Sequence, residues 1–83
     1  MKVLIHPHAN ERIEERGANI GEVIATVEYG ESFPAKHGRT GFRRNFPFNS
    51  ERLGRYYNTK QVEVCAVQEI DAWLVIRVVT RFF

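Results

Sequence analysis

The hydrophobic positions at the start of the chain predict a short strand followed by a helix. Residues 2–5 form an apolar run typical of a strand. Pro7 predicts the first turn of a helix, because its fixed φ suits that position and its missing N–H leaves no donor unpaired. His6 then becomes the cap residue. We expect this helix to run to about Arg16 and to end at Gly17 in the left-handed conformation.

A second helix follows directly. Asn19 and Glu22 have the spacing of a capping box, in which each side chain binds the backbone N–H of the other residue. Apolar residues then recur at spacings of three and four, which mark one face of a helix: Ile20, Val23, Ile24 and Val27. We expect the helix to end at Tyr29 and Gly30.

The middle of the chain gives a weaker pattern of extended segments. Residues 33–35 are expected to be extended, residues 36–41 to form a loop, and residues 42–48 to alternate as a strand. Pro47 cannot donate a hydrogen bond to a neighbouring strand, which favours an edge or a strand end. Residues 49–57 fit either a loop or a single helical turn, and the pattern does not decide between them.

The last third predicts a hairpin of two strands, residues 61–69 and 73–83, joined by a turn. Both faces of the final strand are largely apolar, so we expect it inside the sheet. Strict alternation assigns its even-numbered residues to one face and its odd-numbered residues to the other. Residues 1–83 therefore predict one α+β domain, with two N-terminal helices packed on a twisted, mainly antiparallel sheet of three to five strands.

Composition narrows the class of protein. A hydrophobic content of 43% is enough for one packed core, and nine of the twelve Lys and Arg residues are Arg, the side chain best suited to phosphates. Cys65 is the one cysteine, which excludes an internal disulfide, and its apolar surroundings favour an inert core thiol. The chain shows neither a signal peptide nor a membrane span, so we expect a cytoplasmic protein without membrane contact.

The first predicted helix carries the candidate catalytic residues. Ala9, Ile13 and Arg16 form its inward stripe, and His8 and Arg12, four residues apart, lie on the flank of that stripe. The helix dipole disfavours the imidazolium form of His8, and a neutral imidazole is what a general base needs. Free N–H groups in this turn would add an anion site. The alternative is a histidine that only begins the helix.

Arg16 lies close to the apolar stripe of that helix. A charge near the core is costly unless it is paired, so we expect its side chain to bind a carboxylate or a helix-end carbonyl. Its predicted role is structural.

A basic track is predicted beyond the helices. Lys36, His37 and Arg39 stand between glycines, an arrangement that suits a nucleic-acid phosphate, although a mobile solvated loop is the alternative. Arg43 would continue this track onto the sheet. No carboxylate or thiolate falls at ligand spacing from the histidines, so we expect neither a metal nor a cofactor.

Arg77 and Arg81 lie on one face of the final predicted strand, about 13 Å apart by strand rise. Two guanidinium groups on a mostly apolar face are costly unless that face lines a groove. This pair therefore predicts a binding surface on the sheet.

Together these features resemble the domain of unknown function family 4258, which is placed near the RelE/ParE-like toxins. The residues that carry the resemblance are His8-Ala9, Arg12, Glu15-Arg16-Gly17 and the C-terminal Val78-Val79-Thr80. It is strongest over residues 3–30 and 73–82. The chain departs from the family at His6, where a small hydroxyl residue is expected, and in the longer, more irregular segment 42–57.

The resemblance implies metal-independent cleavage of RNA by an endoribonuclease. His8 would act as base or acid, Arg12 would stabilise the charge that develops on phosphorus, and Lys36, Arg39 and Arg43 would hold the RNA strand. An antitoxin protein would be the partner, and we expect a monomer or a weak dimer. The alternative is a non-catalytic module on the same fold that binds nucleic acid or protein.

Overall fold

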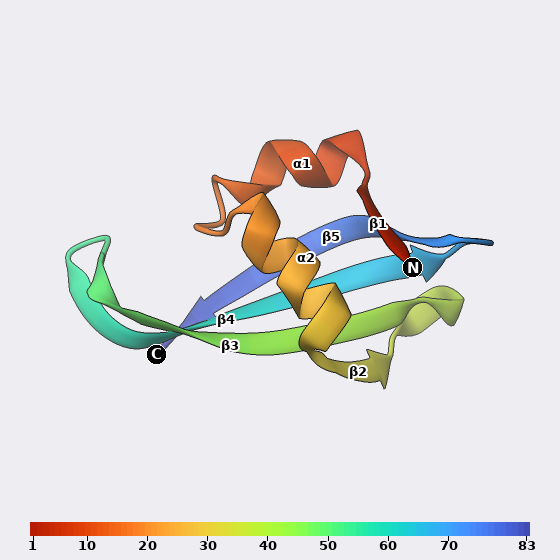
Figure 1. Ribbon diagram of the computed structural model, residues 1–83. Helices are drawn as coiled ribbons and strands as arrows, with labels where there is room; N and C mark the ends of the chain where they lie inside the picture. The colour runs from red at the N-terminus through yellow and green to blue at the C-terminus, as the bar shows by residue number, and fades with distance from the viewer.

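Five strands form one sheet in the order β1-β5-β4-β3-β2, and two helices lie on one of its faces (Figure 1). This computed structural model describes residues 1–83. The elements are β1 (Lys2–Ile5), α1 (Pro7–Ile13), α2 (Ile20–Tyr29), β2 (Glu31–Pro34), the 3-10 turn η1 (Lys36–Gly38), β3 (Thr40–Arg52), β4 (Arg55–Gln68) and β5 (Ala72–Phe82). The fold is α+β, and β1 precedes both helices.

The sheet is mainly antiparallel. β2, β3, β4 and β5 pair as antiparallel neighbours, whereas β1 pairs with β5 in parallel. β5 therefore lies inside the sheet, as its two apolar faces predicted. Neither helix is long and apolar enough to cross a membrane.

His6 caps α1, as the sequence predicted. Its Nδ1 accepts a hydrogen bond from the backbone N–H of His8 at 3.2 Å, and Pro7 occupies the first turn. The helix ends at Ile13, three residues earlier than expected, and the chain then turns. Gly17 has a φ of +81°, the left-handed conformation that glycine adopts most readily.

The capping box of α2 is also confirmed. The N–H of Asn19 donates to Oε1 of Glu22 at 3.1 Å, and the N–H of Glu22 donates to Oδ1 of Asn19 at 2.8 Å. Lys60 on β4 reaches the same carboxylate and also donates to the carbonyl of Gly17 at 3.0 Å. The start of α2 is thus fixed to the sheet beneath it.

Side chains from the sheet also hold the turn between the helices. The hydroxyl of Thr80 on β5 donates to the carbonyl of Arg16, and a guanidinium nitrogen of Arg52 on β3 lies 3.5 Å from the carbonyl of Glu15. The side chain of Arg16 makes no ion pair or hydrogen bond, so the predicted pairing of its guanidinium is wrong. The backbone of this turn is what the sheet binds, and the Arg16 guanidinium is left free.

The core lies between the helices and the sheet. Its buried cluster comprises Ala9, Ile13, Ala18, Val23, Val27, Phe42, Val62, Val64, Ala66, Val75 and Val78. Burial of one valine side chain contributes about 1.5–3 kcal/mol, so this cluster is the main source of stability. The opposite face of the sheet has no helix over it (Figure 1).

A β-bulge changes the predicted faces of β5. Cys65 pairs with Arg77, but the next residue, Ala66, pairs with Val75, so β5 has one extra residue at this point. Val75 and Val78 consequently both face the core. The prediction of strict alternation along the final strand is wrong, because a bulge shifts the pleat by one residue.

The segment that the sequence left undecided is a hairpin. β3 continues to Arg52, Leu53 and Gly54 form the turn, and β4 begins at Arg55. Both turn residues have positive φ, +54° and +79°, as a two-residue type I′ turn requires. This hairpin curves away from the body of the molecule (Figure 1, left).

Candidate functional site

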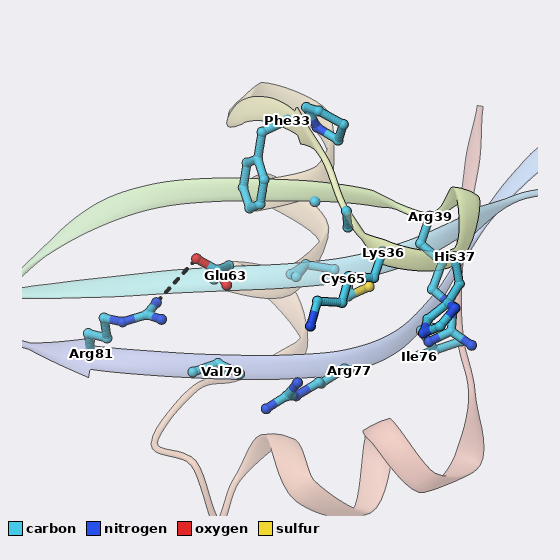
Figure 2. Close-up of a pocket in the computed structure, with 14 residues that line it drawn as sticks. Phe33, Lys36, His37, Arg39, Glu63, Cys65, Ile76, Arg77, Val79 and Arg81 are labelled. Atoms are coloured by element: carbon cyan, nitrogen blue, oxygen red, sulfur yellow. Dashed lines mark hydrogen bonds and ion pairs between the residues drawn. The ribbon is translucent and has the colours of Figure 1, made fainter.

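The uncovered face of the sheet is hollowed into a groove with a volume of about 710 Å³. We call it the open-face groove. Residues from β2, η1, β3, β4 and β5 line it (Figure 2). Its basic residues are Lys36, His37, Arg39, Arg77 and Arg81, and its one carboxylate is Glu63. Five of the six residues that were predicted to contact nucleic acid therefore lie around one groove.

Glu63 neutralises only part of this charge. Its Oε1 lies 3.2 Å from Nη1 of Arg81 and 3.4 Å from Nε of Arg43. The only other ion pair in the protein joins Lys60 and Glu22, on the helix side of the sheet. Lys36, Arg39 and Arg77 have no carboxylate within ion-pair distance, so their charges are available to an anionic ligand.

Arg43, the sixth predicted residue, does not line the groove. Its guanidinium lies over the ring of Phe33, 4.5 Å from the ring centroid, and its buried Nε makes no hydrogen bond despite its closeness to Glu63. Phe33 in turn covers Gly41, where a β-carbon would lie 2.3 Å from the ring. Arg43 therefore supports the wall of the groove.

A smaller pocket of about 230 Å³ lies between α1 and β5. We call it the edge pocket. It occurs where β1 has ended, because β1 pairs with β5 only as far as Val75. Its lining residues are His8, Arg12 and Arg16 from the first helix and the turn after it, and Ile76, Arg77 and Val78 from β5. Three guanidinium groups and one imidazole thus meet with no carboxylate among them.

Arg77 and Ile76 line both hollows. Ile76 is the residue of β5 that the bulge leaves without a partner in β4. In Figure 2 the side chain of Arg77 leaves β5 toward α1, and that of Ile76 lies at the end of the open-face groove. The two hollows therefore share this short segment of β5.

The anion site expected at the N-terminus of α1 has one free N–H group fewer than the sequence suggested. The N–H of His8 is already bound to His6, and α1 has only seven residues. The rings of His6 and His8 stack with their centroids 5.6 Å apart. His8 is exposed, and its ring makes no hydrogen bond. The positive charge of the edge pocket comes from the side chains of Arg12, Arg16 and Arg77.

The sequence suggested that Cys65 lies in the core, and this prediction is wrong. It is half-buried and lines the open-face groove, opposite Arg77 on the neighbouring strand. Val64 and Ala66, on either side of it, are both fully buried on the helix side. That alternation is the signal in the sequence that places the thiol on the other face.

Arg16 was also missed as a site residue, because its position near the apolar stripe suggested a structural role. The early end of α1 brings it into the turn and beside Arg12 in the edge pocket.

No family model matches the sequence, and no curated protein or solved structure shows significant similarity to it. The resemblance to the RelE/ParE-like toxins stays a prediction.

Proposed function

We propose that this protein is a metal-independent endoribonuclease of the RelE/ParE-like toxin type. One observation carries the proposal: an imidazole and three unpaired guanidinium groups line the edge pocket, and Arg77 joins that pocket to the basic groove on the open face. A phosphodiester with a neighbouring nucleophile is the ligand that suits such a set.

The proposed chemistry begins at the 2′-hydroxyl of the RNA. His8 accepts the proton of this hydroxyl as its oxygen attacks the adjacent phosphorus. Negative charge then increases on the phosphoryl oxygens, and the guanidinium groups of Arg12, Arg16 and Arg77 stabilise it. Preorganised cations in a site of this kind stabilise a transition state more than the ground state, because the charge they meet is largest there.

The open-face groove holds the RNA strand beside the cleaved bond in this proposal. Lys36 and Arg39 from the β2–β3 connection contact phosphates, and the apolar lining around Phe33 accepts a base. An antitoxin that covers the open face is the expected partner, since the sheet has no layer of its own there.

The test is RNA cleavage by purified protein in the presence of EDTA. We expect the wild type to produce 2′,3′-cyclic phosphate ends, and His8→Ala to reduce the rate by about 100-fold or more. Because His8 is exposed, the His8→Ala variant should melt at nearly the same temperature as the wild type. Arg55→Ala, at the distant hairpin, is the matched control and retains activity. Full cleavage by His8→Ala contradicts the proposed mechanism.

The second candidate is a non-catalytic nucleic-acid-binding module on the same fold. The observation in its favour is that no hydrogen bond orients the His8 ring, whereas catalytic bases are usually held by one. This candidate predicts RNA binding without cleavage, and equal affinity for the wild type and His8→Ala. Contact through three or four cations gives a slope of roughly −2 to −3 for log affinity against log salt in either case.

A further inference from the structure

We propose that His37 is the general acid that completes the site, donating a proton to the leaving 5′ oxygen. This inference rests on the proposed ribonuclease activity and adds to it a second catalytic residue. It begins from the turn η1, whose backbone conformation is unusual.

His37 has a φ of +61° and a ψ of 35°, inside the left-handed region. Residues other than glycine adopt this conformation uncommonly, and histidine is one of the types that tolerate it. The next residue, Gly38, also has a positive φ of +70°. Backbone strain of this kind is often found where a side chain must be presented to a site. Here it presents the imidazole over the groove, beside Ile76 and Arg39 (Figure 2).

The two histidines line different hollows that share one short segment of β5. His8 lines the edge pocket with Ile76 and Arg77, and His37 lines the open-face groove with the same two residues. In the proposed complex, a phosphate bound at Arg77, where the two hollows share their lining, is reached by His8 from the edge pocket and by His37 from the open-face groove. Displacement at phosphorus places the attacking and leaving oxygens roughly in line, so the base and the acid must stand on opposite sides of it.

Of the other titratable groups near the two hollows, Glu63 and His6 are already engaged, whereas the Cys65 thiol and the Lys36 ammonium are free. Glu63 is held by two arginines, and Nδ1 of His6 caps α1. The thiol of Cys65 lies on the floor of the groove. None of the three tyrosines lines either hollow. His37 is exposed and makes no side-chain hydrogen bond, so its ring is free to meet a substrate.

The proposed step balances without a further reactant. The 2′ oxygen forms a bond to phosphorus as His8 takes the 2′ proton. The bond between phosphorus and the 5′ oxygen breaks, and the imidazolium of His37 gives its proton to that oxygen. The products are a 2′,3′-cyclic phosphate and a 5′-hydroxyl, with the proton transferred overall from His37 to His8.

The test compares two oligoribonucleotides that differ by one atom. The first has the natural 5′ oxygen at the cleaved bond, and the second has a bridging sulfur there. A thiolate leaves without protonation, so the sulfur substrate does not need the acid. His37→Asn should cleave the natural substrate about 100-fold more slowly than the wild type and the sulfur substrate within about fivefold of the wild-type rate. His8→Ala should be slow on both.

Asparagine is the chosen replacement because it tolerates the left-handed backbone of residue 37 but cannot transfer the proton. His37→Gly gives a second variant in which the turn is unstrained. It should show the same rates as His37→Asn on the two substrates. Lys36→Met, a matched change in the same turn, should slow both substrates equally because it removes only a phosphate contact.

Three outcomes decide the matter. Selective recovery on the sulfur substrate in both His37 variants supports the inference. Equal loss on both substrates, or no loss on either, overturns it while the proposed ribonuclease activity stands. A wild type that cleaves neither substrate overturns the proposed function, and the role of His37 with it.

Discussion

The ammonium of Lys60 on β4 lies 2.8 Å from the carboxylate of Glu22, in the first turn of α2. Only 8% of Lys60 is exposed, and its ammonium also binds the Gly17 carbonyl. Glu22 simultaneously closes the capping box with Asn19. One carboxylate thus neutralises a buried charge and begins a helix.

Loss of this carboxylate should be costly. Glu22→Ala leaves the buried ammonium without a counter-charge and removes half of the capping box, so we expect about 3 kcal/mol of lost unfolding free energy. Glu22→Gln keeps a capping side chain and should cost less. Glu28→Ala, at an exposed position on the same helix, should change stability by less than about 0.5 kcal/mol. Urea unfolding of the three variants measures the differences, and equal losses for Glu22→Ala and Glu28→Ala would contradict the role of the pair.

Gly17 and Gly54 provide a matched comparison of two left-handed glycines, with φ of +81° and +79°. Gly54→Ala should cost about 1 kcal/mol, the conformational penalty alone, because no atom lies within 4 Å of the new β-carbon. Gly17→Ala should cost about 2 kcal/mol, because its β-carbon would lie 2.7 Å from Nη1 of Arg52 and displace that side chain from Phe82. Thermal or urea unfolding tests the order, and a larger loss at Gly54 would refute it.

Leu53→Asn should stabilise the protein by about 0.5–1 kcal/mol. Leu53 has a φ of +54° and is 94% exposed, so it contributes little packing and carries a backbone penalty. Asparagine followed by glycine is the preferred pair for a type I′ turn. An increase in the denaturant midpoint without a change in slope confirms the effect, and an unchanged or lower midpoint argues against strain at the tip.

Arg77→Ala should weaken RNA binding and reduce the magnitude of the salt slope by about 0.7, the value for one phosphate contact with a single strand. Arg81→Ala should have a smaller effect, because Glu63 already pairs with this guanidinium. Arg55→Ala lies outside both hollows and serves as the control. Fluorescence anisotropy at several salt concentrations measures all three slopes. An Arg77→Ala slope equal to that of Arg55→Ala would remove Arg77 from the interface.

Local signals in the sequence were sufficient for the helices and for the final hairpin. Pro7, Asn19 and Glu22 specify helix starts through bonds within a few residues, so the sequence alone reveals them. The early end of α1 was not predictable in this way. Side chains of Thr80 and Arg52, far away in the sequence, bind the turn that follows it.

The bulge in β5 is one feature of the site that the sequence did not reveal. The extra residue in β5 is visible only in its pairing with β4, so counting alternate residues along β5 alone cannot detect it. The bulge lies at Ile76 and Arg77, the two residues that line both hollows. Lys60 was missed for a simpler reason: it has the same phase as Val62 and Val64, which signals burial, but a lysine is not expected at such a position.

The parallel pairing of β1 with β5 has a consequence for synthesis of the chain. Lys2 pairs with Ala72, and Ile5 with Val75, so about seventy residues separate the partners. A ribosome releases β1 and both helices long before the strand that completes their core. Until β5 pairs with β1 and β4, the valines of β4 cannot complete the core. The arginines that line the two hollows cannot come together before then either. The nascent protein is therefore without a formed site until its last strand is in place.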